Sequence, residues 1–467
     1  MHSNQHPVFL PARSGRIFFS LYAAAWAIAA AAAWAFPQAA AAQRQTPAPA
    51  GFEALRQRLQ DDLKRSSLSA KPASDPGCQL ESLLGGKLYS DKNLSRLRNQ
   101  SCASCHQLNP AINPETGQPF PVPGFVDAEN VERGTPVSDG SVAGRFGRLN
   151  APSVGYAAFS PPFHWDKAEE LYVGGQFWNG RASTLADQAA QPFLNPDEMA
   201  MPGKAAVVER LKENPSYRLL FWMVYKLKIA RALSPAGIDA VYDAMTKAIA
   251  AFERTRQFRK FTSKFDYFMA GKTELTPLER RGLNLFNNKA KCAACHISTP
   301  AKKPDGTWAP ALFTDFTYDN IGAPRNLNIP GNPEPDKGLG GRPDIAAADP
   351  QGFEIGKHKV MTLRNIAITP PYGHNGVFKT LEQITHFYNT RDTLGRVPDN
   401  RHPGFGVTGW PPPEVPQNVN ASELGNLGLS PGEEAALVAF MKTLTDGYPL
   451  WGGDPGVPPG TPAPYGP

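Results

Sequence analysis

Two short motifs of the same form, SCASCH at 101–106 and KCAACH at 291–296, carry the residues with the clearest capacity for chemistry. Each motif places two cysteines two residues apart and a histidine directly after the second cysteine. Thiols and an imidazole at this spacing could bind a metal ion, form a redox-active dithiol or attach to a cofactor covalently. The chain has five cysteines, and four of them lie in these motifs. Its chemistry is therefore predicted to centre on two equivalent sites.

The two motifs favour covalent haem over the other readings. A structural zinc site takes four ligands, whereas each motif offers three and the copies lie far apart. A thioredoxin-like dithiol is expected in a βαβ context, which this sequence does not show. In CxxCH, the thiols can add to the vinyl groups of haem, and the histidine can then bind the iron. We predict two haem c groups; the attachment and ligand residues are Cys102, Cys105, His106, Cys292, Cys295 and His296.

The beginning of the chain predicts export. Arg13 and Arg16 precede an apolar run at 17–36, and Ala40 and Ala42 offer a cleavage site. We therefore predict a signal peptide at 1–42 and a periplasmic protein. An uncleaved membrane anchor is the less favoured alternative, since the apolar run is long for a signal. The net charge of +6 is mild and not gathered in basic runs, so a nucleic-acid partner is not expected.

Helical periodicity alternates with long irregular stretches. The chain holds 42 glycines and 47 prolines, which indicates many loops. Apolar residues recur at spacings of three and four over 205–260, and Thr276, Pro277 and Glu279 mark the start of another helix. The predicted organisation is a linker or loose helix at 43–75, a first haem domain at 76–265, a second at 266–450 and a disordered tail at 451–467.

Longer motifs resemble one enzyme family. The stretches GGQFWNGRASTLADQAAQPFLNPDEM at 174–199 and TLRNIAITPPYGHNGVFKTLEQITHFYN at 362–389 are similar to signatures of the bacterial dihaem cytochrome c peroxidases and the related MauG-type enzymes. The resemblance also includes LNAPS at 149–153 and the approach to the second CxxCH, and spans about 78–447. It implies a mainly α, loop-rich fold of two cytochrome-c-like domains with one haem each. It also implies that the first haem is the peroxide site and that the second stores and relays an oxidising equivalent.

The resemblance assigns roles to further residues. It implies that Glu198 is the acid/base above the first iron, that Gln188 is a distal amide and that Trp178 lies on the electron path between the haems. A carboxylate there could accept a proton from peroxide and return it, and the amide could orient peroxide without titrating. The family also binds a calcium ion between the haems, and the matching positions are Asn150, Thr369 and Pro371.

Two departures from the usual peroxidase pattern bear on the iron ligands. No histidine occurs in 107–149, the stretch that supplies a blocking ligand in many relatives. An open first iron that needs no reductive activation is therefore expected. Typical peroxidases carry methionine fourteen residues after the position of His374, where this chain has Tyr388, as MauG-type enzymes do. We predict Tyr388 as the second ligand of the second haem, with Met361, or no side chain at all, as alternatives.

These observations predict a periplasmic dihaem peroxidase. It would reduce hydrogen peroxide to water with electrons from a small cytochrome c or a cupredoxin. One alternative is a MauG-type enzyme that uses peroxide to oxidise residues of a partner protein. Another is a non-catalytic dihaem electron carrier, which would have no need of Glu198. A homodimer is compatible with the sequence but is not encoded in any motif.

Overall fold

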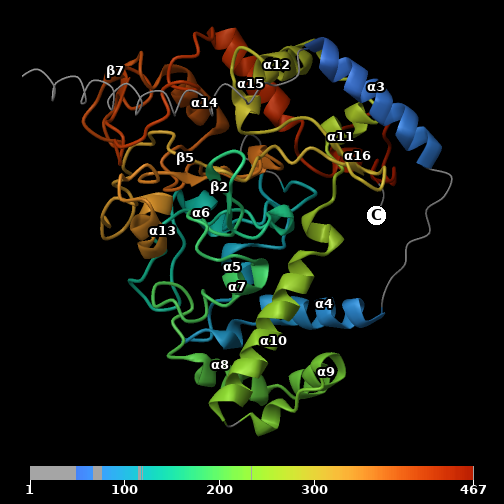
Figure 1. Cartoon of the computed structure of the whole chain (residues 1–467), viewed down its shortest axis with the longest axis vertical. Helices are drawn as coiled ribbons and strands as arrows, with labels where there is room; N and C mark the ends of the chain where they lie inside the picture. The colour runs from blue at the N-terminus through green and yellow to red at the C-terminus, as the bar shows by residue number, and fades with distance from the viewer. Residues whose placement is uncertain (1–48, 67–75, 114–116, 118, 233, 466–467) are drawn as a thin grey trace, which may run out of the picture. The chain divides into compact units, whose positions relative to one another are not determined.

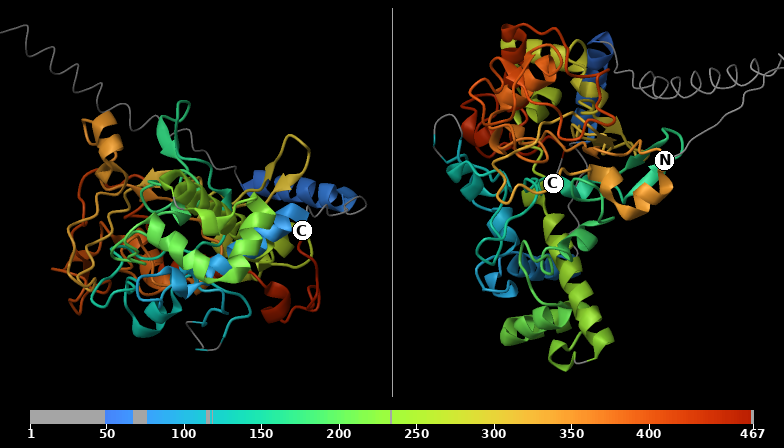
Figure 2. Two further views of the ribbon diagram at one scale, coloured as in Figure 1. Left: turned by 90° about the horizontal axis from the view of Figure 1, so that it is seen from below. Right: turned by 90° about the vertical axis from the view of Figure 1, so that its left-hand side faces the viewer.

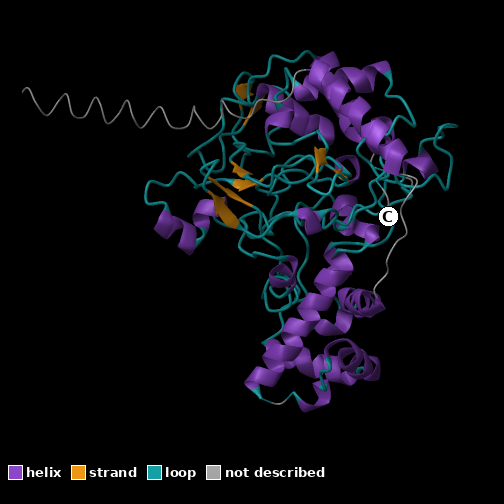
Figure 3. Cartoon of the chain, turned by 45° about the vertical axis from the view of Figure 1, so that its right-hand side comes forward, coloured by secondary structure: helices purple, strands orange, loops and turns teal. Residues whose placement is uncertain are grey.

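The computed structural model describes residues 49–66, 76–113, 117, 119–232 and 234–465 (Figure 1). The predicted signal peptide, 1–42, lies outside the described residues. Within them, no helix combines the length and the apolar character needed to cross a bilayer. The described chain is mainly helical and rich in loops, as predicted, and Figure 3 shows only short strands among the helices.

The helices fall into two sets along the chain. The first set comprises α3 (Pro49–Ser66), α4 (Pro76–Tyr89), α5 (Cys102–Cys105), α6 (Ala128–Arg133), α7 (Leu185–Ala189), α8 (Lys204–Glu213), α9 (Pro215–Tyr225) and α10 (Pro235–Glu253). The second set comprises α11 (Lys264–Met269), α12 (Pro277–Asn287), α13 (Pro343–Ala348), α14 (Leu381–Thr390), α15 (Pro431–Lys442) and α16 (Tyr448–Trp451). Single turns of 3₁₀-helix lie between them: η1 (Lys92–Leu94), η2 (Ala157–Phe159), η3 (Ile229–Arg231), η4 (Arg256–Phe258), η5 (Cys292–Ala294), η6 (Gly338–Gly341) and η7 (Ile366–Ile368).

The strands form two-stranded sheets. Three pairs are antiparallel: β1 (His164–Asp166) with β2 (Leu171–Val173), β3 (Ala301–Lys302) with β4 (Trp308–Ala309), and β5 (Tyr318–Asp319) with β6 (His358–Lys359). One pair, β7 (Gly395–Arg396) with β8 (Gly409–Trp410), is parallel. The β5–β6 pair matters most for the site. Both strands lie in the loop region after the second CxxCH motif, and the amide of Lys359 in β6 donates to the carbonyl of Trp178 at 2.7 Å.

One helix-packing arrangement occurs twice. A Cβ on Gly85 in α4 would overlap the carbonyl oxygen of Ala248 in α10, and a Cβ on Gly282 in α12 would overlap that of Ala436 in α15. In both pairs the helix that precedes a CxxCH motif thus crosses a later helix in backbone contact, which only glycine permits. Figures 1 and 2 show α4 with α10 and α12 with α15 in these two places.

Each crossing lies in its own hydrophobic core. Residues of 84–258 form one cluster around α10, including Leu84, Val241 and Met245. Residues of 265–444 form another around α12 and α15, including Leu283 and Phe440. The helices predicted over 205–260 are present as α8, α9 and α10. Thr276 caps α12 as predicted, since its hydroxyl accepts a hydrogen bond from the amide of Glu279 at 3.3 Å.

Two terminal segments differ from the sequence predictions. The stretch predicted as a linker or loose helix, 43–75, contains helix α3, but this helix is docked: it buries Phe52 in the second core, and Arg56 donates to the carbonyl of Phe268 at 3.0 Å. The tail predicted to be disordered, 451–467, is packed as far as residue 465: Val457 is buried, and Tyr267 donates to the carbonyl of Thr461 at 3.0 Å. In both places a few apolar side chains find partners that are distant in sequence, which local composition does not reveal.

Candidate functional site

The first CxxCH forms a single helical turn. The amide of His106 donates to the carbonyl of Cys102 at 2.9 Å, which closes α5, and Tyr89 donates from its hydroxyl to the carbonyl of His106 at 2.9 Å. Burial raises the pKa of the Cys102 and Cys105 thiols, the latter to about 12. The thiols therefore stay protonated, and the turn holds them beside the imidazole.

His106 has the properties of a neutral iron ligand. Burial lowers its pKa to about 4, opposed by the nearby carbonyls of Phe125 and Pro152. Its Nδ1 is buried and meets neither carbonyl at hydrogen-bonding geometry, so it has no partner among the described residues. A neutral imidazole is the form that binds a metal ion.

Glu198 lies close to this motif. Its carbonyl accepts from the amide of Ser141 at 2.7 Å, and its neighbour Met199 belongs to the core against which Cys102 packs. The charge of Glu198 adds to the rise in the pKa of both thiols. Its Oε1 accepts a hydrogen bond from Asn195 Nδ2 at 2.7 Å. Burial raises the pKa of Glu198, while the Arg181 guanidinium and the Asn195 amide oppose that rise. The carboxyl is thus suited to gain and lose a proton nearer to neutral pH than an ordinary glutamate.

Gln188 lies on α7, which begins at the capping residue Thr184, and its side chain is half-buried. Gln188 and Glu198 lie in the same short segment of the chain. Among the described residues, no hydrogen bond joins their side chains. His164, the next histidine in the chain after His106, lies exposed on β1 with Nδ1 2.8 Å from the carbonyl oxygen of Pro162.

Trp178 stands between the two halves of the chain. Its indole N–H donates to the carbonyl of Asn150 at 2.8 Å, and its ring meets that of His374 edge-on, with centroids 6.5 Å apart. It also lines a cavity of about 240 Å³ whose wall includes the second CxxCH. Trp178, which is predicted to lie on the electron path, therefore borders the cavity of the second CxxCH.

The second CxxCH opens into this cavity. His296 Nδ1 lies 2.9 Å from the carbonyl oxygen of Phe313, which favours the tautomer with the proton on Nδ1 and leaves the Nε2 lone pair free to bind iron. Burial lowers the pKa of His296 to about 4, and the carbonyls of Phe313 and Met361 oppose this. The cavity lining is mostly apolar and includes Cys292 and Cys295. This donor set in an apolar cavity fits a covalently attached haem.

Tyr388 and Met361 both line the cavity. Burial raises the pKa of the Tyr388 phenol, and the nearby thiols of Cys292 and Cys295 add to the rise. The phenol therefore stays protonated unless a metal ion replaces the proton. The carbonyl of Met361 opposes the fall in the pKa of His296, so the Met361 backbone lies near that histidine.

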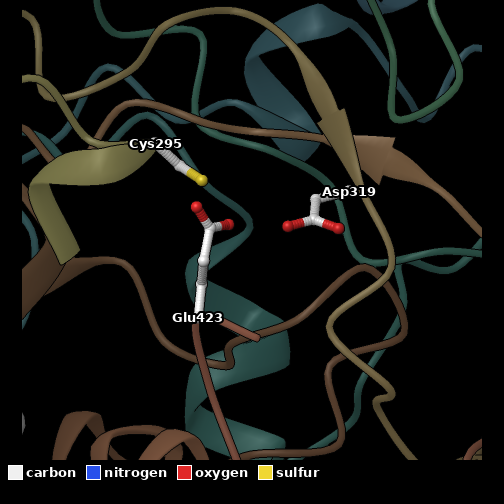
Figure 4. A group of neighbouring side chains, drawn as sticks. All are labelled: Cys295, Asp319 and Glu423. Carbon is white, nitrogen blue, oxygen red and sulfur yellow. The ribbon is translucent and has the colours of Figure 1, made fainter. Parts of the chain in front are cut away.

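Two carboxylates beside Cys295 were not singled out from the sequence. Figure 4 shows Asp319 and Glu423 turned toward the Cys295 sulfur, and the three ligand atoms lie within 4.8 Å of one another. Asn420 Nδ2 donates to both carboxylates, at 2.7 and 2.8 Å. Cys295 cannot serve as a thiolate ligand once it carries haem, so we assign the pair to the surroundings of the second haem.

The three predicted calcium-binding positions meet at the same cavity wall. Asn150, Thr369 and Pro371 all line it, and Asn150 Nδ2 donates to the Pro371 carbonyl at 2.7 Å. A cation would need the amide turned so that its oxygen faces the carbonyls, and the two orientations of an amide fill the same space. Asparagine and carbonyl oxygens are ligands that calcium accepts.

A stacked histidine pair was also missed. His358 reads as a loop residue in the sequence but lies in β6, buried, with its ring parallel to that of His374 at 3.7 Å. His358 Nε2 lies 3.1 Å from Asp336 Oδ1, and His374 Nε2 lies 3.1 Å from Glu414 Oε2. His358 lies on β6 and His374 in a later turn, and the two rings meet only in the tertiary fold, so no local pattern could have shown the pair.

Comparison with known proteins settles the family. Residues 80–274 match the family model described as "Di-haem cytochrome c peroxidase". The chain is 40% identical over 387 residues to the methylamine utilization protein MauG of Paracoccus denitrificans, covering 81% of this chain and 90% of that protein. It is 30% identical to the cytochrome c551 peroxidase of Nitrosomonas europaea, covering 78% and 80%. The chain belongs to the dihaem cytochrome c peroxidase family.

Structural comparison agrees. The crystal structure of the diheme peroxidase BthA from Burkholderia thailandensis matches with a TM-score of 0.65 and 31% identity, covering 81% of this chain and 88% of that chain. As a member of the dihaem peroxidase family, the protein is a peroxide-using oxidoreductase, and the family implies two haem c groups. The reading as a non-catalytic electron carrier is therefore set aside.

Proposed function

We propose that this protein is a periplasmic dihaem peroxidase that reduces hydrogen peroxide to water, taking two electrons from a small cytochrome c or cupredoxin. In this proposal each CxxCH carries one haem within its own cytochrome-c-like domain, at 76–265 and 266–450. The repeated crossing of α4 on α10 and of α12 on α15 supports the two-domain reading. His106 and His296 would hold the irons, and the haem of the first motif would supply the metal at which peroxide is reduced.

Glu198 is the observation that carries the proposal. Its neighbour Met199 packs in the core that Cys102 joins, burial raises the pKa of its carboxyl, and Asn195 donates to Oε1 at 2.7 Å. Cleaving the O–O bond of peroxide requires a proton to move from one oxygen to the other. A carboxylate held in place can accept that proton and deliver it to the leaving oxygen. Gln188, on the neighbouring α7, would orient the peroxide by hydrogen bonding.

Trp178 would carry electrons from the second site to the first. It lines the cavity of the second CxxCH, and its N–H bond to the carbonyl of Asn150 holds the indole in place. The same Asn150, with Thr369 and Pro371, would hold a calcium ion that fixes the tryptophan relative to both domains. This assignment rests on the convergence of the three residues on one wall.

Tyr388 would be the sixth ligand of the second iron. Its phenol borders the cavity, whereas the Met361 backbone lies beside the proximal His296. A phenolate is a hard anionic ligand that stabilises oxidised iron. The half-buried carboxylates of Asp319 and Glu423 would act in the same direction by electrostatics. The second haem should therefore be able to store an oxidising equivalent.

The proposal is tested by steady-state turnover of the holoprotein. We expect catalytic oxidation of a reduced small cytochrome c or cupredoxin on addition of peroxide, with two electrons consumed for each peroxide. No pre-reduction should be needed, since 107–149 contains no histidine to block the first iron. Absence of turnover with either donor, or turnover only after reduction of the protein, would contradict it.

A second function has its own support. Tyr388 and the 40% identity to the Paracoccus denitrificans MauG favour an enzyme that uses peroxide to oxidise residues of a partner protein. The two proposals separate in one experiment, because a MauG-type enzyme would react with peroxide at once but would turn over reduced cytochrome c slowly. Fast turnover favours the peroxidase.

A further inference from the structure

A line of aromatic side chains runs outward from the segment that carries Trp178. At its outer end the β1–β2 hairpin exposes Trp165, whose side chain is 44% accessible. The Trp165 ring meets Tyr172 edge-on, with centroids 4.8 Å apart. Tyr172 stacks on Phe163 at 5.2 Å, and Phe163 meets Tyr318 at 6.0 Å. Each ring is therefore in contact with the next.

The inner end of this line reaches Trp178 through a close contact. Gly180 has φ +66°, and a Cβ there would overlap the hydroxyl of Tyr318 and the ring of Phe163. Tyr318 pairs across the β5–β6 sheet with Lys359, whose amide donates to the carbonyl of Trp178 at 2.7 Å. Tyr318 itself is buried and donates to the carbonyl of Gly174 at 2.5 Å. Along the main chain, Asn179 and Gly180 thus separate Trp178 from the contact with Tyr318 and Phe163.

The composition of the line suits electron transfer. Trp178, Tyr318, Tyr172 and Trp165 are tryptophan or tyrosine, the side chains that lose one electron most readily, and the remaining member, Phe163, bridges two tyrosines in van der Waals contact. Packing alone would not require an indole at the exposed end, since a large apolar group gains little there.

We propose that Trp165 is a surface redox site, at which a reductant too large to reach the haem delivers electrons to the enzyme. This rests on the proposed function, because the oxidant is hydrogen peroxide reduced at the first haem. Each electron leaving Trp165 is matched by loss of the indole N–H proton to solvent, and the reductant restores the electron while solvent restores the proton. Two such cycles supply the two electrons that, with two protons, convert one peroxide to two waters.

The charges around the hairpin indicate the kind of reductant. Glu169 and Glu170 are exposed at its turn and Asp166 is half-buried there, against one exposed cation, Lys167. On the side of Tyr172, Asp344 pairs with Arg342 at 2.6 Å and Glu354 pairs with Lys357 at 3.2 Å, so the excess of acidic charge lies at the hairpin turn. The surroundings are acidic, so we infer a small redox protein with a basic contact face.

The first test uses the holoprotein and peroxide without any donor. Oxidising equivalents should then be trapped at the surface as hydroxylated tryptophan, with the balance Trp + H2O2 → Trp-OH + H2O. Trp222 on α9 is a matched control, since it is 47% exposed and Lys226 lies over its ring. Peptide mass spectrometry should find several-fold more added oxygen at Trp165 than at Trp222. Tyr172→Phe, which keeps the ring but removes the phenol, should abolish the excess.

The second test measures donor oxidation. With a reduced cytochrome c of basic contact face, Trp165→Phe should turn over several-fold more slowly than wild type, and Trp222→Phe should match wild type. Ascorbate, which is small and anionic, should be oxidised equally by all three proteins. Equal amounts of added oxygen at Trp165 and Trp222, or an unchanged turnover rate for Trp165→Phe, would overturn the inference. If that protein still consumes peroxide normally, the proposed function stands. A wild-type protein that consumes no peroxide overturns both.

Discussion

Replacing Glu198 by glutamine removes a proton acceptor while keeping the shape of the side chain. Asn195 can still donate to Oε1 of a glutamine, so the segment should keep its conformation. A positioned acid or base contributes about 10²- to 10⁴-fold to a rate, equivalent to about 3–5 kcal/mol in the barrier. We therefore expect Glu198→Gln to lower the rate of reaction with peroxide by that factor. Asp197→Asn, the adjacent carboxylate paired with Arg145 on the surface, should react like wild type.

The pH dependence gives an independent check on Glu198. The carboxyl accepts a proton only when ionised, and burial raises its pKa above the ordinary glutamate value. The wild-type rate should thus fall as the pH drops through this raised pKa, whereas Glu198→Gln should show no such limb. Stopped-flow absorbance with one equivalent of peroxide measures both. A Glu198→Gln variant that reacts as fast as Asp197→Asn, or that keeps the acid limb, would refute the assigned role.

Three further predictions concern the ligands and the supporting structure. Tyr388→Phe should raise the reduction potential of the second haem in a spectroelectrochemical titration, because an anionic ligand is lost. If the potential is unchanged in Tyr388→Phe but shifts in Met361→Leu, the ligand assignment is reversed. Asp266 accepts two hydrogen bonds from the buried Arg364 guanidinium, both at 2.9 Å. Asp266→Asn removes this bidentate partner and should lower the free energy of unfolding in urea by about 3–5 kcal/mol. If its stability equals that of Asp239→Asn, which breaks an exposed ion pair, the prediction is wrong. Chelation with EGTA should lower the thermal midpoint of wild type but not of Asn150→Ala, and equal responses would exclude a calcium ion held by Asn150.

Local signals in the sequence predicted the framework well. The capping residues Thr276 and Glu279 marked the start of α12, and the periodicity over 205–260 corresponds to α8, α9 and α10. The two CxxCH motifs predicted equivalent sites, and in both copies the motif closes a turn in which the histidine amide donates to the carbonyl of the first cysteine at 2.9 Å. These features depend on residues within one or two helical turns, where spacing alone fixes which side chains meet.

Contacts between distant segments could not be predicted in the same way. Phe52 is buried against a core more than two hundred residues away, although the composition around it favours a linker. His358 resembles an ordinary loop histidine in the sequence, but in the fold its ring stacks on that of His374 from another segment. Asp319, on β5, and Glu423, in a later loop, meet beside Cys295. In each case the chemistry depends on tertiary pairing rather than on a local pattern.

EPR spectroscopy of the oxidised holoprotein, before and after one equivalent of hydrogen peroxide, tests the open iron beneath Glu198 most directly. We expect a high-spin ferric signal from the first haem, present without prior reduction and lost within the mixing time on addition of peroxide. Two low-spin signals that peroxide leaves unchanged would show that a side chain closes the first iron, and would contradict the assignment of this site as the place where peroxide is reduced.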